Sequence, residues 1–428
     1  MRWTRSATTS RASSVASEPP SPDAPIALGT PAYRALTLAM LFAGFSTFSL
    51  LYSVQPLLPL FAAHYGLSAE AASLAVSLAT GPLAVTILFA GIVSDRVGRR
   101  GLMVAAMFAG GGLTLAAAVA PGWYALLALR LLTGIALAGV PAVAMAYVAE
   151  EVDAASVGAA MGLYIAGSAI GGMGGRLASS LVASVGGWRV ALAVVGLIGL
   201  AMAEAFRRLA PPSRRFVRRT GRPGEIVADL KALLGDRALP WLYAEGFVLM
   251  GIFVTIYNYA GFRLLAPPYG LSQAGVSAVF LLYILGSWSS AWFGGLAGRI
   301  GRRTVFWWPI LLTMAGIALT AARPLVLVVA GIGVVTVGFF GAHSIASAWV
   351  GRRAGPRRGQ AAAWYLFFYY CGSSVLGSAG GIAWTRAGWT GVAIFCLGLG
   401  ALALIGGLVL RRVPPLADTA TPAAVIEA

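Results

Sequence analysis

The feature that most constrains this chain is a series of long apolar runs. About 20 such residues cross the hydrocarbon core of a bilayer as a helix. Twelve runs are present, near residues 35–60, 72–93, 102–120, 123–148, 157–181, 188–206, 240–262, 275–297, 304–322, 324–349, 359–382 and 388–410. The runs are rich in Gly and Ala and lack the alternation of barrel strands. We therefore predict an all-α integral membrane protein with twelve transmembrane helices and the lipid bilayer as its surroundings.

Composition supports this reading. The 428 residues are 59% hydrophobic and only 11% charged, whereas a soluble protein has about 45–50% apolar and about 25% charged residues. A soluble core cannot absorb this excess, because packed cores stop growing near about 250–300 residues. The two cysteines, Cys371 and Cys396, lie inside apolar runs, and no metal-binding spacing or cofactor motif is visible.

The net charge of +17 could suggest a nucleic-acid partner. Placement of the charges argues against one. With a cytoplasmic N-terminus, 25 of the 31 Lys and Arg fall in the tails and in every second loop, on the cytoplasmic side. This is the positive-inside pattern. We expect a multi-pass protein of a bacterial inner membrane with both termini cytoplasmic and no nucleic-acid partner.

Internal repeats divide the chain into two halves. Tyr65-Gly66-Leu67-Ser68 recurs at 269–272, the loop 91–100 recurs at 294–303, Gly167-Ser168 recurs at 372–373, and Gly187-Trp188 recurs at 388–389. The offsets are nearly constant and each pair holds the same place in its half. The predicted units are a disordered tail 1–33, a six-helix bundle 34–206, a basic cytoplasmic linker 207–239, a second six-helix bundle 240–412 and a tail 413–428. Two parallel pseudo-symmetric bundles of this kind are a transporter design.

The loop GIVSDRVGRR, at 91–100, resembles the most specific signature of the major facilitator superfamily. The runs YSVQPLLPLFA, GLYIAGSAIGGMGGRL, YAEGFVLMG and WYLFFYYCGSS resemble a bacterial branch of inner-membrane exporters labelled arabinose-efflux-like or drug:proton antiporter-like. The resemblance covers residues 34–412. It implies alternating access, in which one half rocks against the other.

A gate is expected on the cytoplasmic side, where the resemblance implies that an acid and arginines lock the two halves together. The candidates are Gly91, Asp95, Arg96, Gly98, Arg99 and Arg100, with Glu150 and Glu151 as partners of Arg96 or Arg100, and in the second copy Arg299, Gly301, Arg302 and Arg303. Gly298 replaces the acid in that copy, so its half is expected to lack an equivalent lock. The alternative is a topology signal, which the arginines alone would provide.

Three ionisable residues inside the spans are candidates for proton coupling. Arg130 lies in a run that resembles the fourth-span motif linked to proton transfer, although its side chain could instead extend to the outer surface. Glu245 lies in the seventh span and His343 in the tenth. A buried Glu can load and release protons, and a His titrates in the physiological range. Simple packing roles remain open for both.

Polar and aromatic residues inside the spans are candidates for substrate binding. They are Tyr52, Gln55, Tyr164, Arg176, Asn258, Tyr365 and Tyr369. By helical angle, Asn258 and Glu245 point in different directions from one helix. Glycines expected to let helices pack closely are Gly134, Gly139, Gly167, Gly171 and Gly175. The fifth-span glycines resemble an antiporter motif, but Gly172 stands where that motif has proline.

These observations favour a secondary transporter. No GxxxxGK[ST] loop is present, so an ion gradient, with protons as the coupling ion, is the expected energy source. The leading hypothesis is a monomeric, proton-coupled exporter of small amphipathic compounds or sugars. The alternative is an importer of a small metabolite or organic anion, with Arg130 or Arg176 as counter-ion. A membrane enzyme or sensor would need a catalytic cluster or a soluble domain, and neither is recognisable.

Overall fold

The computed structural model describes residues 24–216 and 223–414, and nearly all of these residues are helical. A single β-bridge, between Ile26 and Val152, is the one β-type pairing in this part of the chain. The first half contains α1 (Pro31–Tyr52), η1 (Gln55–Leu57), α2 (Leu58–Tyr65), α3 (Ala69–Val97), α4 (Arg99–Ala118), α5 (Trp123–Leu137), α6 (Ala144–Glu151) and α7 (Val157–Leu209).

A short linker helix, α8 (Pro223–Leu234), separates the halves. The second half contains α9 (Leu239–Leu265), α10 (Gln273–Ser277), η2 (Ala278–Leu282), α11 (Tyr283–Ile300), α12 (Arg302–Val305), α13 (Trp307–Thr320), α14 (Leu325–Ala354), η3 (Gly355–Arg357) and α15 (Arg358–Arg412). The helix α8 lies inside the segment predicted from sequence only as a basic linker.

The described residues contain twelve membrane-crossing segments, which confirms the predicted fold. Eight helical stretches are long and apolar enough to cross a membrane, and the stretch Trp123–Leu137 is a shorter one that α6 extends. Two of the long stretches hold more than one crossing. The backbone reverses at Gly187 inside α7 and at Gly388 inside α15, while α14 runs into α15 through η3.

The repeats found in the sequence correspond to matching turns. Gly98 and Gly301 both take a positive φ, of 89° and 95°, where the second span of each half ends. Gly187 and Gly388 do so as well, with φ of 73° and 54°. Only glycine adopts this region without strain. The same chain reversal is therefore built at the same place in each half.

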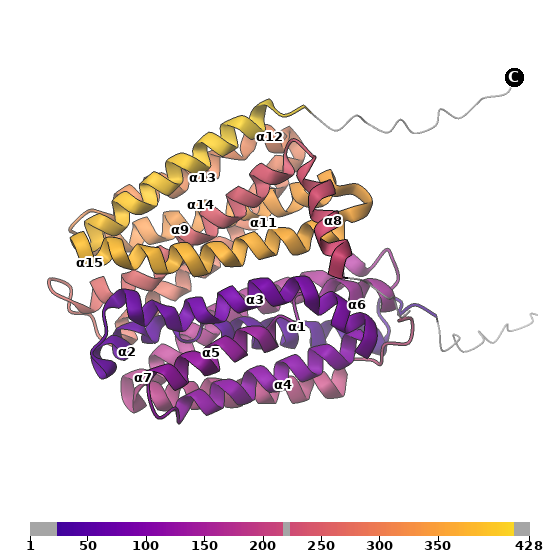
Figure 1. Ribbon diagram of the computed structural model, residues 1–428, viewed down its shortest axis with the longest axis horizontal. Coiled ribbons are helices and arrows are strands. Elements are labelled where there is room, and N and C mark those ends of the chain that lie inside the picture. The colour runs from indigo at the N-terminus through magenta and orange to yellow at the C-terminus, as the bar shows by residue number, and fades with distance from the viewer. Residues whose placement is uncertain (1–23, 217–222, 415–428) are drawn as a thin grey trace, which may run out of the picture.

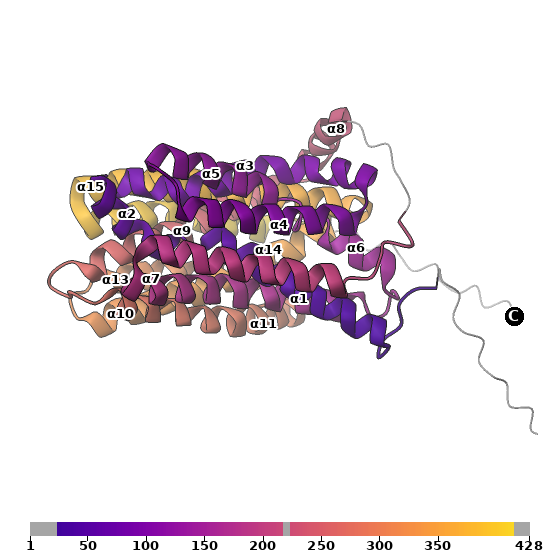
Figure 2. The same ribbon diagram turned by 90° about the horizontal axis from the view of Figure 1, so that it is seen from below.

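The two halves lie side by side with their helices running along the same direction (Figure 1). The linker helix α8 and helix α6 lie at one end of the bundle, and α2 and α10 lie at the other (Figures 1 and 2). We call these the linker end and the far end. Pro31, where α1 begins, and Arg412, where α15 ends, both belong to the linker end.

The halves are joined by hydrogen bonds at the far end. Ser77 Oγ lies 2.6 Å from Ser378 Oγ, Ser374 donates to the Ser77 carbonyl, and Gln273 donates to the Pro56 carbonyl. All of these groups belong to the far parts of their helices. Between the twelve described spans, no hydrogen bond or ion pair joins the halves near the linker end. The structure is therefore closed at the far end.

Candidate transport and gating sites

A buried cluster of polar residues lies where the halves meet. Arg176, on α7, is only 3% exposed. Its Nε donates to Gln55 Oε1 at 2.6 Å, and its Nη1 donates to the Gly172 carbonyl at 2.6 Å. Gln55 Nε2 in turn donates to Asn258 Oδ1, on α9 of the other half, at 2.7 Å. The chain Arg176–Gln55–Asn258 thus crosses from one half to the other.

Aromatic rings enclose the guanidinium of this cluster. Its Cζ atom lies 4.4 Å from the ring centre of Tyr52 and 4.8 Å from that of Tyr283. Both distances are within the range of cation–π contacts. Tyr52, Gln55, Arg176 and Asn258 were each predicted from sequence as substrate-binding residues, and the structure brings all four together. Tyr283 was not predicted.

Arg130 has a different environment. The residue is 1% exposed, and its guanidinium donates to the carbonyls of Leu50, Leu51 and Ala75. Leu50 and Leu51 belong to the last turn of α1, whose final carbonyls have no partner within the helix. Arg130 therefore caps the C-terminal end of α1 inside the bundle, and its side chain does not extend to the surface.

Glu245, on α9, is 2% exposed, and neither carboxyl oxygen has a hydrogen-bond partner in the described part of the chain. A β-carbon at Gly406 of α15 would overlap its Oε1 atom, so the carboxyl packs directly against that glycine. An ion without a partner is very costly to bury. The expected divergence of Glu245 from Asn258 agrees with this geometry, because Glu245 packs against Gly406 whereas Asn258 contacts Gln55 of the first half.

His343 forms part of an aromatic cluster between α14 and α15. Its Nδ1 lies 3.0 Å from the Tyr365 hydroxyl, and its ring centre lies 4.8 Å from that of Tyr369. These three predicted residues therefore lie together. Tyr164, on α7, is 8% exposed and its hydroxyl has no partner within residues 24–216 and 223–414.

The predicted packing glycines lie against neighbouring helices. A β-carbon at Gly167, Gly171 or Gly175 would overlap Leu41, Phe45 or Ser49 of α1, respectively. One at Gly134 would overlap the Ala79 carbonyl of α3, and one at Gly139 would crowd Ala106 of α4. These glycines bring α1 and α7, and α3 and α5, close enough to fix the position of Arg176 and Arg130.

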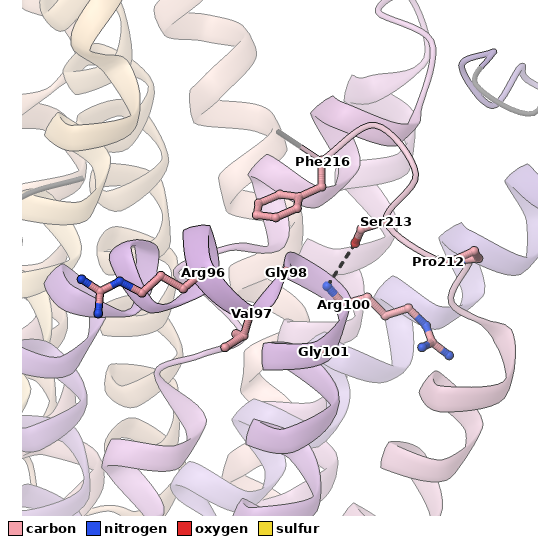
Figure 3. A pocket seen from close by; sticks show the side chains of 8 residues that line it. All are labelled: Arg96, Val97, Gly98, Arg100, Gly101, Pro212, Ser213 and Phe216. Carbon is pink, nitrogen blue, oxygen red and sulfur yellow. Dashed lines mark hydrogen bonds between the residues drawn. The ribbon is translucent and has the colours of Figure 1, made fainter. Parts of the chain in front are cut away.

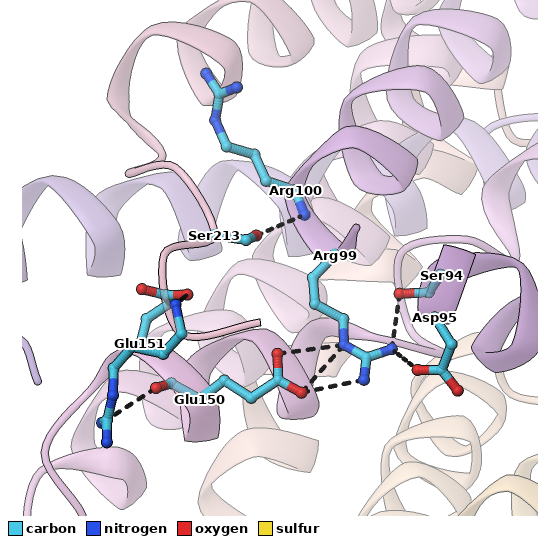
Figure 4. A network of polar contacts seen from close by, with 8 residues as sticks. Ser94, Asp95, Arg99, Arg100, Glu150, Glu151 and Ser213 are labelled. Carbon is cyan, nitrogen blue, oxygen red and sulfur yellow. Dashed lines mark hydrogen bonds and ion pairs between the residues drawn. The ribbon is translucent and has the colours of Figure 1, made fainter. Parts of the chain in front are cut away.

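The charged residues where α3 meets α4 form a network within the first half (Figure 4). Arg99 is its centre: Nη1 lies 2.7 Å from Asp95 Oδ1 and 2.9 Å from Ser94 Oγ, and Nη2 lies 3.0 Å from Glu150 Oε1. Glu150 therefore pairs with Arg99, not with Arg96 or Arg100. Glu151 accepts from the backbone nitrogen of Arg215.

Arg96 and Arg100 have separate environments around a pocket of about 330 Å³ at the linker end (Figure 3). Arg100 donates to the carbonyls of Arg207 and Ala210, where α7 ends, and so caps that helix. Arg96 is exposed, and its guanidinium points away from Ser213 and Phe216. It has no hydrogen bond or ion pair within the described residues.

The second copy of the loop is simpler. Gly301 holds the turn, and Arg303 donates to the Val413 carbonyl at 2.8 Å. Arg299 and Arg302 make no ion pair in the described ranges. Gly91 and Gly98 lie before and at the turn of the first copy, where a β-carbon would meet open space.

The sequence analysis missed a partly buried ion pair of the second half at the linker end. Asp236, just before α9, pairs with Arg353 of α14 at 2.7 Å. Burial raises the pKa of the Asp236 carboxyl, but hydrogen bonds from Arg353 and from the backbone of Ala238 and Leu239 outweigh it, so the pKa lies below its usual value. The sequence signal was an acid shortly before a span, where a carboxylate can accept from the first backbone N–H groups of the helix, as Asp236 does from Ala238 and Leu239.

Comparisons with known proteins agree with this architecture. The chain is 41% identical over 389 residues to the inner membrane transport protein YnfM of Escherichia coli, covering 90% of this chain and 92% of that protein. It is 43% identical over 364 residues to the uncharacterized MFS-type transporter YybF of Bacillus subtilis, covering 85% and 90%.

The fold resembles a crystal structure of the nucleoside transporter NupG with a TM-score of 0.73 and 16% identity, covering 88% of this chain and 99% of that one. Residues 38–295 match the family described as Major Facilitator Superfamily. With its twelve spans in two repeated halves, the chain is a multi-pass membrane transporter that belongs to the major facilitator superfamily.

Proposed function

We propose that this transporter exports small amphipathic compounds from a bacterial cell by alternating access, driven by the proton gradient. The observation that carries the proposal is the unequal contact between the halves. Hydrogen bonds join the halves at the far end, while no hydrogen bond or ion pair joins the described spans of the two halves at the linker end. Rocking about the interface would open the far end as it closes the linker end.

The linker end is cytoplasmic in this proposal, because it carries the basic loops. The protein then faces inward, with both termini in the cytoplasm of a bacterium, and acts as a monomer. Reporter fusions after Arg100, Arg303, Arg358 and Arg412 test the orientation. All four should report cytoplasm, and an external signal from any of them contradicts the arrangement.

Glu245 is the proposed proton carrier. Its carboxyl is buried without a hydrogen-bond partner among the described residues, so the uncharged, protonated form is the stable one in this state. A change in the packing of α9 against α15 within the second half during the transport cycle would change that environment and release the proton. His343 and Arg130 are less suited: His343 is held by Tyr365, and Arg130 is fully engaged by backbone carbonyls.

The test uses purified protein in proteoliposomes with an imposed pH gradient. Addition of a transported compound should dissipate the gradient, reported by an entrapped pH-sensitive dye. Reversing the gradient should reverse the direction of substrate movement. Compound flux that is indifferent to the gradient would refute proton coupling.

Import of an organic anion is the second candidate, because Arg176 is a buried cation at the interface of the halves. The resemblance of the fifth-span glycines to antiporters favours export. The two candidates differ in one measurement: whether substrate moves with the imposed proton gradient or against it.

A further inference from the structure

The cluster around Arg176 contains groups that can donate hydrogen bonds and lack acceptors. Asn258 Nδ2 and the hydroxyls of Tyr52 and Tyr283 are buried without a partner in the described residues. Arg176 Nη2 also makes no hydrogen bond within the part of the chain that the structure describes. Buried polar groups are normally paired, so several unpaired ones together indicate a missing partner.

The direction of the hydrogen bonds in this cluster is fixed by chemistry. A guanidinium only donates, so Gln55 must turn its oxygen toward Arg176. Its amide nitrogen then faces Asn258, which must accept with Oδ1. The free atom of Asn258 is therefore Nδ2, which can only donate. This order does not depend on how amide oxygens and nitrogens are distinguished.

The charge of Arg176 is not balanced by the protein. No ion pair holds it among the described residues. Glu245, on the neighbouring helix α9, lies 13 residues from Asn258, which is about 20 Å along that helix. The remaining described acids lie at the two ends of the bundle. A buried arginine is costly unless an anion or several acceptors compensate it.

Aromatic rings continue from this cluster into the second half. Tyr283 contacts Phe253 at 5.5 Å between ring centres, and Phe253 stacks on Phe339 at 4.0 Å. Phe339 in turn stacks on His343 at 5.9 Å. The unpaired donors and the cation thus lie at one end of an apolar, aromatic wall.

We propose that Arg176, Asn258, Tyr52 and Tyr283 form the binding site for the anionic group of the substrate, and that the substrate is an aromatic organic anion. The inference rests on the proposed transport function and names the substrate class of that site. The carboxylate or similar group accepts from Nη2 of Arg176, Nδ2 of Asn258 and the two phenols. The aromatic body of the substrate lies along the wall of rings.

The test compares benzoate with benzamide, which has nearly the same shape and no charge. Binding is measured on the purified protein as a rise in melting temperature with ligand concentration. Benzoate should stabilise the wild type and benzamide should not. Equal responses to the two compounds, or no response to benzoate, would overturn the assignment.

Variants locate the site. Arg176→Gln should weaken benzoate binding by about ten- to a hundredfold, the factor that corresponds to one charge-assisted hydrogen bond. Arg176→Lys should lose less affinity than Arg176→Gln, because lysine keeps the positive charge. It should still bind more weakly than the wild type, because lysine lacks the planar group that contacts the rings. Arg323→Gln, at an exposed position at the far end, is the matched control for loss of one positive charge and should bind as wild type.

Tyr283→Phe covers the case in which the Arg176 variants do not fold. It removes one donor and keeps the ring, so it should fold and bind benzoate severalfold more weakly; unchanged binding contradicts the site. Flux assays separate the two proposals. Gradient-driven flux of neutral compounds without anion binding would support the proposed transport and contradict the anion site. Anion binding without any flux would support the anion site and contradict the proposed transport.

Discussion

Substitution of Arg99 by Gln should lower the stability of the first half at its linker end. Arg99 is the only cation paired with Asp95 and Glu150 among the described residues, and it joins α3, α4 and α6. Its side chain is 8% exposed. The Arg99→Gln variant leaves two carboxylates close together without their shared cation.

The size of the effect follows from the burial of the three groups. Breaking a buried ion pair costs about 3–5 kcal/mol, whereas an exposed pair contributes about 0–1 kcal/mol. Asp95 is 17% exposed and Glu150 is 27% exposed, so water partly replaces the lost cation. We expect a loss of about 2–3 kcal/mol, which corresponds to a fall in melting temperature of about 5–10 °C for a unit the size of one half.

The neighbouring arginine provides a matched control. Arg96 belongs to the same loop but is exposed and unpaired within the described residues. Arg96→Gln should therefore change the melting temperature by no more than about 2 °C, as for other surface substitutions. Both variants are compared with wild type in detergent by intrinsic tryptophan fluorescence. Equal melting temperatures for Arg99→Gln and Arg96→Gln would refute the structural role of the Arg99 network.

Three further predictions concern coupling, gating and pH. Glu245→Gln should abolish gradient-driven flux but retain substrate exchange, because Gln mimics only the protonated acid; undiminished gradient-driven flux would assign the proton elsewhere. If Asp95 helps to close the linker end, Asp95→Asn should shift the equilibrium toward the state closed at the far end by about ten- to a hundredfold. The accessibility of cysteines introduced at the two ends measures this shift. Equal labelling in variant and wild type would leave Asp95 with no role beyond orienting Arg99. Asp236→Asn should lower stability at neutral pH by about 1–2 kcal/mol. Because the pKa of Asp236 in the folded protein lies below its usual value, the contribution of Asp236 to stability is complete above about pH 4 and is lost as pH falls through the folded pKa. A difference in stability between variant and wild type that persists in acid would contradict this.

Much of the fold could be predicted because its signals are local. Apolar runs give the spans, and the repeated glycines mark turns that only glycine forms readily, as at Gly98 and Gly301. Arg176, Gln55 and Asn258 were also found, because a charge or amide within an apolar run has few roles other than binding or pairing, whereas Tyr283 of the same cluster was not.

The partners of these residues could not be predicted, because they depend on how helices are rotated and spaced. The sequence placed Asp95 and Glu150 on one side of the membrane but did not indicate that Arg99, one of three neighbouring arginines, would join them. Likewise, the role of Arg130 depends on where α1 ends, at Tyr52, a boundary that lies inside the apolar run 35–60 predicted as the first span. Ser77 and Ser378, small polar residues within apolar runs, are the kind of signal that could have revealed the contact between the halves.

The two ends of the molecule differ in the chemistry of the groups that could close them. At the far end, the hydrogen bonds between the halves are made by neutral serine, glutamine and asparagine groups and by backbone carbonyls. At the linker end, the described residues form ion pairs between arginines and carboxylates. At 0.1 M ionic strength, mobile ions weaken the interaction between exposed charges over a screening length of about 10 Å. They leave neutral hydrogen bonds nearly unaffected. Ionic strength on the linker side, varied alone in sealed vesicles, should therefore change the rate of turnover, while the same change on the far side should not.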